Sequence, residues 1–197
     1  PDRTCQRRGT LITDSTIPGI TKSLLRLSRQ IDQAEFVPVT ASHCSKMSFK
    51  RRCRQHVLRE FGRILDRGLG ITTSFAALPA ALPCAKDFLQ KLSGEERMLT
   101  GRFHAVCFAV LTGTPFLAMR SNSSKIESFI GDVGLSTERM VEAGISPEEL
   151  SQRLSRCDFS ESEEHNRQRF LDSARSSMAE MFAAIATDAR AVRFKNR

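Results

Sequence analysis

Two side chains that can carry positive charge occupy the expected starts of two consecutive helices. Thr100, Gly101 and Arg102 form the expected tight turn between a strand and the first of these helices. His104 falls in the first turn of that helix, and Lys125 opens the next helix after a polar loop. In a parallel α/β sheet both positions lie at the carboxyl ends of neighbouring strands, where such folds bind ligands. Helix N-termini also attract negative charge, so this part of the chain predicts a site for an anion.

The polar residues of this segment differ in the chemistry that they allow. A histidine at a helix start can donate a hydrogen bond to a phosphate or carboxylate oxygen, or transfer a proton near neutral pH. His104 is therefore the candidate catalytic residue, and an ordinary helix-start histidine is the alternative. Lys125, Ser121 and Asn122 can surround anionic oxygens and are candidate substrate-binding residues. Arg102 cannot share a helix face with His104 if both are fully helical. It is a candidate substrate-binding residue, and the alternatives are that it holds the turn in place or forms a salt bridge elsewhere.

Two further features of the segment can be explained with or without a ligand. Thr100 is expected to cap the helix, and Gly101 to let the backbone approach a ligand closely. A lysine at a helix N-terminus opposes the helix dipole, so Lys125 needs a compensating negative charge. A bound anion would supply that charge, and Glu127 or Asp132 is the alternative source.

Hydrophobic spacing supplies the elements that position these residues. Short apolar runs predict strands at residues 10–13, 36–40, 97–100 and 116–119, with weaker candidates at 69–73 and 139–141. Helical spacing predicts helices at residues 21–31, 57–65, 87–92, 102–112 and 125–133, one that begins at 147, and a long final helix over 160–190. The phenylalanines and methionines of the final helix are interpreted as packing residues. The alternation of strands and helices predicts one α/β domain over residues 1–197, a Rossmann-like doubly wound parallel sheet.

Composition limits the classes of function. The longest apolar run is well short of the roughly 20 residues that a membrane span needs, so no transmembrane segment is expected. The six cysteines show no Cys-x-x-Cys pair, which is typical of reduced thiols in a cytoplasmic protein. The net charge of +8 indicates an acidic partner or an anionic surface. The chain begins with Pro1 and reaches an apparent internal strand at once, which suggests a portion of a longer protein.

A strongly basic segment at residues 46–59 offers a second, different site. It can bind nucleic acid, membrane lipid or an acidic glycan, or it can be a solvated helix face. No DNA- or RNA-binding pattern accompanies it, so no nucleic-acid partner is expected. His43, Cys44, Cys53 and His56 lie in or near the segment, but their spacing matches no usual structural zinc site, and no metal is expected.

Residues 97–135 resemble the polysaccharide pyruvyl transferase family. That family typically shows Ser/Thr-x-Arg, an apolar residue and His, then an apolar helix, Gly-x-Pro, an apolar strand and a polar loop with lysine. Here the corresponding runs are residues 100–106, 113–118 and 121–127, and the segment closes at 132–135. The resemblance over residues 9–40 is weak, and a further phosphoenolpyruvate-binding arginine expected in the family has no counterpart that we can place.

The resemblance implies a fold of two facing Rossmann-like domains, similar to the glycosyltransferase-B architecture. This chain would supply the C-terminal domain, without the N-terminal partner domain. The implied reaction moves the enolpyruvyl group of phosphoenolpyruvate onto a sugar of a cell-surface polysaccharide or exopolysaccharide and forms a pyruvate ketal. The motif histidine maps onto His104 and the loop lysine onto Lys125, and both would handle the phosphate or carboxylate of the donor. No cofactor is implied beyond phosphoenolpyruvate as donor substrate.

The resemblance also carries expectations about partners and location. The expected partners are phosphoenolpyruvate and a saccharide acceptor, either free or lipid-linked, and a homo-oligomer is left open. The expected location is the cytoplasm, with the inner face of the membrane as a variant. Two other functions remain as alternatives. One is a nucleotide-sugar glycosyltransferase of similar fold, and the other is a non-catalytic basic domain that binds anionic polymers through residues 46–59.

Overall fold

The computed structural model describes residues 7–39 and 85–195, and the side chains of residues 7–39 and 85–187. Its centre is a five-stranded sheet in the order β2-β1-β3-β4-β5, and every neighbouring pair of strands is parallel. The strands are β1 (Thr10–Ser15), β2 (Ala34–Phe36), β3 (Arg97–Gly101), β4 (Phe116–Met119) and β5 (Met140–Val141). The expected Rossmann-like α/β fold is thus confirmed at the level of a parallel sheet with flanking helices.

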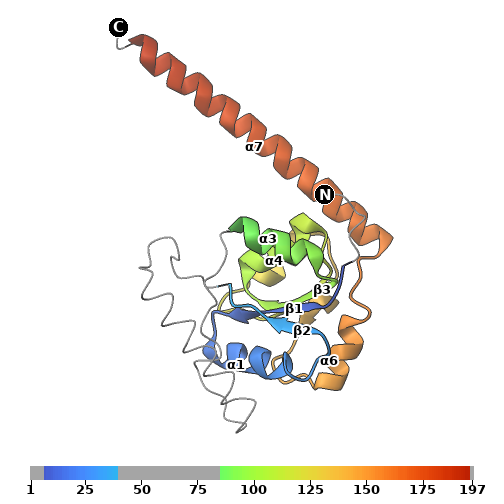
Figure 1. Ribbon diagram of the computed structural model, residues 1–197. Helices are drawn as coiled ribbons and strands as arrows, with labels where there is room; N and C mark the ends of the chain where they lie inside the picture. Colours follow the sequence, from blue (N-terminus) through green and yellow to red (C-terminus); the bar gives the residue numbers. More distant parts are fainter. Residues whose placement is uncertain (1–6, 40–84, 196–197) are drawn as a thin grey trace, which may run out of the picture.

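Helices cover both faces of this sheet (Figure 1). The helices are α1 (Pro18–Leu27), α3 (Ala85–Gly94), α4 (Phe103–Thr112), α5 (Lys125–Val133), α6 (Pro147–Leu154) and α7 (Glu161–Lys195), with a short 3₁₀ helix η2 (Thr137–Arg139) before β5. One hydrophobic cluster joins α3, α4, α5 and the start of α7 to one face of the sheet. A second cluster joins α1 and α6 to the other face.

The two clusters follow from the alternation of side chains along each strand. In β1, Leu11 belongs to the first cluster and Ile12 to the second. In β4, Phe116 likewise belongs to the first cluster and Leu117 to the second. All four side chains are at most 3% exposed. Burial on both faces explains why these strands read as continuous apolar runs in the sequence.

The ends of α4 and α5 are set by glycines. Gly113 follows α4 with φ of 64°, a left-handed conformation that favours glycine. Two arginines then bind the last carbonyl groups of α4. Arg7 donates from Nη1 to the carbonyl oxygen of Gly113 at 2.7 Å and from Nη2 to that of Thr112 at 3.0 Å. Arg167 donates to that of Val110 at 2.8 Å. The negative end of the α4 dipole is therefore neutralised, while its positive end lies at the opposite edge of the sheet.

The structure confirms some predicted boundaries and corrects others. The strand at 116–119 and the helix at 125–133 have the predicted bounds. The predicted helix at 21–31 instead spans Pro18–Leu27, because Pro18 is favourable at a helix start. The predicted strand at 36–40 is Ala34–Phe36, and it ends before Pro38. The helix predicted at 57–65, the strand candidate at 69–73, the basic segment 46–59 and the zinc candidates lie outside the described residues.

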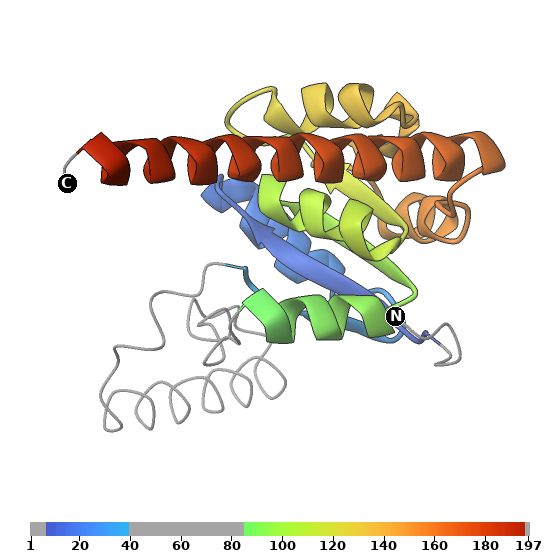
Figure 2. The ribbon, with the colours of Figure 1, turned by 90° about the horizontal axis from the view of Figure 1, so that it is seen from above.

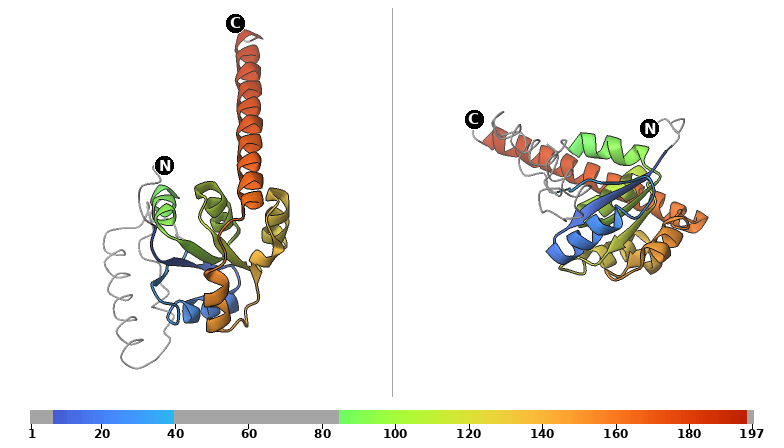
Figure 3. Two further views of the ribbon diagram at one scale, coloured as in Figure 1. Left: turned by 90° about the vertical axis from the view of Figure 1, so that its right-hand side faces the viewer. Right: turned by 60° about the horizontal axis from the view of Figure 1, so that its bottom comes forward.

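The final helix departs most from its interpretation as a packed element. Its first turns pack on the body, where Phe170 and Leu171 contact the first hydrophobic cluster. Beyond them α7 runs well past the other elements (Figures 2 and 3). Met178, Met181 and Phe182 are 50–58% exposed, so they do not pack within the described part of the chain, and the alternative of an exposed Phe and Met face agrees with the structure. The spacing of apolar residues along α7 predicts one apolar face, but it does not show where the helix passes beyond the sheet and its flanking helices.

Candidate functional site

The strand order reverses between β1 and β3. The chain passes from β1 to β2 on one side of the sheet, and β3, β4 and β5 then follow on the other side. In open α/β sheets, ligands bind outside the carboxyl ends of the strands at such a reversal. Three loops meet there: residues 16–17 after β1, residue 102 after β3, and residues 120–124 after β4. These loops contain or adjoin the predicted site residues.

Gly101 ends β3 in close contact with β1. A Cβ atom at this position would lie 2.5 Å from the Cβ of Ser15 and 2.7 Å from its Oγ. Real Cβ atoms do not approach other atoms that closely, so a larger residue forces a shift. The close approach that Gly101 permits is therefore to the neighbouring strand. The expectation that it accommodates a ligand has no support in the packing.

Thr100 is buried beneath the turn and does not cap α4 in the expected way. Its Oγ1 accepts a hydrogen bond from the backbone N–H of Arg102 at 3.0 Å and lies 2.5 Å from Oγ1 of Thr13. Arg102 itself is the N-cap residue of α4, and no side chain caps the first turn. The hydroxyl thus shapes the turn, and no side chain in the part of the chain that the structure describes accepts a hydrogen bond from the first turn of α4.

The same lack of a cap recurs in the two neighbouring helices at this edge. The N-cap residues of α1 and α5, Ile17 and Ser124, accept no hydrogen bond from the first turn through their side chains. In contrast, Ser136, Ser146 and Ser160 accept hydrogen bonds from the first turns of η2, α6 and α7. The three uncapped helices are those that start where β1, β3 and β4 end. Their exposed N–H groups and partial positive charge favour a bound anion.

His104 and Lys125 lie at the starts of α4 and α5, and both are exposed. The imidazole of His104 makes an edge contact with the ring of Phe103, with centroids 5.7 Å apart. Within the described residues, neither side chain makes a hydrogen bond or ion pair. Glu127, an alternative source of compensation for Lys125, pairs with Nε of Arg120 at 3.3 Å. Glu127 lies in the first turn of α5, where its charge offsets part of the helix dipole, but it makes no ion pair with Lys125.

Arg102 forms a salt bridge at the end of β1. Its Nη2 donates to Oδ2 of Asp14, and the side chains are 18% and 5% exposed. Oδ1 of Asp14 accepts the backbone N–H of Val39 at 2.7 Å. The predicted alternative of a salt bridge that holds the turn is thus observed. Sequence reasoning missed Asp14, although an acidic residue near the end of a buried strand was a signal that could have found it.

Ser121 brings the loop after β4 to the loop after β1. Its Oγ lies 3.3 Å from Oγ1 of Thr16 and 3.2 Å from Oδ1 of Asn122. Because β3 lies between β1 and β4, this contact crosses above the end of β3. The structure therefore brings the predicted Ser121 and Asn122 together, adds Thr16 to them, and joins Arg102 to Asp14.

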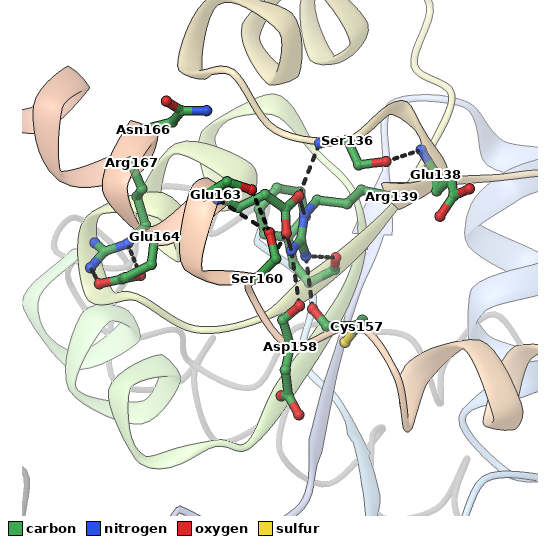
Figure 4. A network of polar contacts seen from close by, with 12 residues as sticks. Ser136, Glu138, Arg139, Cys157, Asp158, Ser160, Glu163, Glu164, Asn166 and Arg167 are labelled. Carbon is green, nitrogen blue, oxygen red and sulfur yellow. Dashed lines mark hydrogen bonds and ion pairs between the residues drawn. The ribbon is translucent and has the colours of Figure 1, made fainter.

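The opposite edge of the sheet holds a very different arginine (Figure 4). Arg139 is 4% exposed, and its guanidinium makes five hydrogen bonds: two to Glu163 and three to the carbonyl oxygens of Phe116, Cys157 and Asp158. It also lies 4.3 Å from the ring centroid of Phe159. A cavity of about 480 Å³ adjoins this cluster. Every N–H of this guanidinium is bonded within the protein, so Arg139 joins elements and has no donor left for a ligand.

Glu163 shows how strongly this cluster stabilises charge. Burial raises the pKa of its carboxyl. The hydrogen bonds from Arg139 and from the backbone N–H groups of Ser136 and Ser160 outweigh burial and lower this pKa to about 2. Cys157 lies beside the cluster, and burial raises the pKa of its thiol to about 11. A thiol with that pKa stays protonated and is a poor nucleophile.

The other sequence expectations concern metal, thiols and membrane. Cys107 and Cys157 are free thiols, as predicted, and the remaining cysteines lie outside the described residues. Among residues 7–39 and 85–187, no three His, Cys, Asp or Glu side chains gather in a way that could hold a metal ion. None of the helices that the structure describes is both long and apolar enough to cross a membrane.

Comparison of the chain with models of protein families and with curated proteins finds no match in either set.

Proposed function

We propose that this chain is the donor-binding domain of a polysaccharide pyruvyl transferase. The reaction would move the enolpyruvyl group of phosphoenolpyruvate onto a sugar of a cell-surface polysaccharide or exopolysaccharide and form a pyruvate ketal. The observation that carries the proposal is the edge at the β1/β3 reversal, where three helix starts without a side-chain cap lie beside His104 and Lys125, which have no hydrogen-bond or ion-pair partner among the described residues. The resemblance of residues 97–135 to the family connects this edge with one particular anion.

Phosphoenolpyruvate suits such an edge because it is small and carries both a phosphate and a carboxylate. The N–H groups of the first turns and the ammonium of Lys125 would bind its oxygens. Ser121 and Asn122 would add neutral hydrogen bonds from the loop after β4. Arg102 would bind the donor from the position that its salt bridge with Asp14 gives it. The site would therefore combine charge with a defined set of donor groups.

The chemistry assigns His104 the role of acid. Protonation of the methylene carbon of phosphoenolpyruvate creates an oxocarbenium-like centre at the carbon that bears the phosphate. One sugar hydroxyl adds to that carbon and gives up its proton. A second hydroxyl of the same sugar then displaces inorganic phosphate, gives up its own proton and closes the ketal ring. The exposed imidazole at the start of α4 is the group that we assign to the first proton transfer.

Titration with phosphoenolpyruvate tests this proposal, by calorimetry at moderate salt. We expect saturable binding that weakens about tenfold or more in Lys125→Ala, because a hydrogen bond to a charged group contributes about 1.5–3 kcal/mol. The matched control is Arg156→Ala, which removes an exposed cation beside the cavity at the opposite edge. If both variants lose affinity equally, the site assignment is wrong and only overall charge matters.

The two alternative functions are distinguished in the same experiment. A glycosyltransferase of similar fold would place a diphosphate at the same helix starts, so it would bind a nucleotide sugar in preference to phosphoenolpyruvate. A basic domain that binds anionic polymers through residues 46–59 would bind them with a steep salt dependence. That binding would survive His104→Ala. The pyruvyl transferase proposal further includes a saccharide acceptor, free or lipid-linked, and a cytoplasmic location with the inner face of the membrane as a variant.

A further inference from the structure

A buried carboxylate at the carboxyl edge connects three distant parts of the chain. Asp14 lies near the end of β1 and is 4% exposed. Its Oδ1 accepts the N–H of Val39, which follows β2, and its Oδ2 accepts Nη2 of Arg102, which follows β3. The ends of three neighbouring strands are therefore joined at a single side chain, directly at the reversal of strand order.

Such a pair has little to offer as a source of stability. Removing a carboxylate and a guanidinium from water costs nearly as much as their attraction returns, and apolar replacements are often equally stable. What the pair does fix is geometry. Arg102 is the N-cap residue of α4, and His104 follows two residues later in the first turn. A hydrogen bond that orients the Arg102 guanidinium thus comes from a residue 88 positions away in the sequence.

We propose that Asp14 is a positioning residue of the anion site, which holds the guanidinium of Arg102 in its binding orientation before an anion arrives. An arginine ordered in advance loses less conformational entropy on binding than a freely rotating one. The identity of the anion as phosphoenolpyruvate rests on the proposed function. The orientation of Arg102 by Asp14 does not, so the two claims are tested separately.

The Arg139–Glu163 pair provides the matched control for this role. Both pairs join a buried carboxylate to an arginine, with side-chain exposures of 5% and 12% for Asp14 and Glu163. The Arg139–Glu163 pair lies at the opposite edge of the sheet, at the amino ends of the strands (the amino edge), where the start of α7 meets the start of β5. Asp14→Asn and Glu163→Gln each remove one charge and leave the shape of the side chain almost unchanged. Any effect that both variants share is an effect of stability alone.

The first measurement needs no anion. In the full chain with ¹⁵N-labelled arginine, a guanidinium held by a carboxylate rotates slowly and gives resolved Nη signals, while an exposed one such as Arg156 gives averaged signals. We expect resolved signals from Arg102, assigned with Arg102→Lys, and their averaging in Asp14→Asn with those of Arg139 unchanged. Averaged Arg102 signals in the unaltered protein would overturn the proposal; this outcome needs Arg102→Lys only for the assignment and does not require Asp14→Asn to fold.

The second measurement is a double-mutant cycle of phosphoenolpyruvate binding. We expect Asp14→Asn and Arg102→Lys each to weaken binding about tenfold or more, since small displacements of a positioned group are costly. The double variant should bind no more weakly than Arg102→Lys alone, and Glu163→Gln should bind like the unaltered protein. Independent, multiplying losses would overturn the proposal. If the unaltered protein binds no phosphoenolpyruvate but shows ordered Arg102 signals that Asp14→Asn averages, the proposed function fails, while the ordering of Arg102 by Asp14 stands.

Discussion

The two edges of the sheet treat charge in opposite ways. At the amino edge, Arg139 donates five hydrogen bonds and is nearly inaccessible to water. At the carboxyl edge, His104 and Lys125 are exposed and make no hydrogen bond or ion pair with any described residue. At the amino edge, the donor groups of Arg139 all bind other parts of the protein and stabilise the fold. At the carboxyl edge, His104 and Lys125 can bind a ligand, and this difference identifies the candidate site.

The helix starts differ between the edges in the same way. At the amino edge, Ser160 and Glu163 of α7 cap each other, because each side chain accepts the backbone N–H of the other residue. At the carboxyl edge, α1, α4 and α5 have no side-chain cap. A missing cap costs about 0.5–2 kcal/mol of stability. Three helices without a side-chain cap at one edge therefore lower stability, and a bound anion would offset this loss by accepting hydrogen bonds from their N–H groups.

The largest expected effect comes from breaking the Arg139 cluster. Arg139→Ala leaves Glu163 buried without its partner and leaves three carbonyl oxygens without a donor. We expect a loss of about 3–5 kcal/mol in the free energy of unfolding, because an uncompensated buried charge is costly. Urea unfolding followed by circular dichroism measures this loss. Anion affinity of the folded fraction should be unchanged, and a parallel loss of affinity would show that the edges are not independent.

The second prediction concerns acid. The pKa of Glu163 is lowered to about 2 in the folded protein from an ordinary value of 4.5. Its contribution to stability is therefore fully present above about pH 4.5, and it is lost as the pH falls toward 2. The difference corresponds to about 3 kcal/mol. Unfolding measured from pH 6 to pH 2 should show this loss in the unaltered protein.

Glu163→Gln is the control for that acid-dependent loss. This variant cannot titrate at position 163, so its stability should start lower at pH 6 and fall less toward pH 2. Equal slopes in the two proteins would mean that other carboxylates dominate the acid response and that the cluster at the amino edge contributes little to it.

Features that depend on neighbouring residues could be predicted from the sequence, whereas contacts between residues far apart in the chain could not. The bounds of β4 and α5 were predictable because apolar spacing and the glycines at 113 and 134 are local signals. The positions of His104 and Lys125 at helix starts followed from the same signals. The Asp14–Arg102 and Arg139–Glu163 pairs are separated by 88 and 24 residues, so only the fold brings their members together.

Two local interpretations failed for related reasons. Gly101 suggested room for a ligand, but its neighbour is Ser15 on an adjacent strand, and the sequence does not show that register. Phe182 suggested a packed helix face, but α7 leaves the body before reaching that residue. Gly101 was correctly interpreted as a site of close approach and Phe182 as an apolar residue of one helix face, but the tertiary structure decides what lies opposite each of them.

The third prediction tests how closely β1 and β3 pack at the carboxyl edge, beneath the exposed His104 and Lys125. Gly101→Ala places a Cβ 2.5 Å from that of Ser15. We expect a loss of about 1–3 kcal/mol in the free energy of unfolding, as overpacking usually costs. The double variant Gly101→Ala with Ser15→Gly removes the two shortest contacts, leaves the Cα of position 15 at 3.1 Å, and should recover part of that loss. No recovery would mean that strain elsewhere in the turn is responsible.

The smallest expected effect is the most specific to the comparison, because its sign depends on whether an anion is bound. Lys125 places a positive charge at the uncapped start of α5, where the helix dipole disfavours it by about 0.3–1 kcal/mol. Without an anion, Lys125→Ala should therefore raise the free energy of unfolding by that amount. With saturating phosphoenolpyruvate the order should reverse, since the unaltered protein gains more from binding. Thermal unfolding of both proteins, with and without the anion, measures the two differences. A lysine that served only as an ordinary surface charge would show no reversal. A reversal would mean that Lys125 lowers the stability of the free protein and strengthens anion binding, whereas Arg139 at the amino edge stabilises the fold alone.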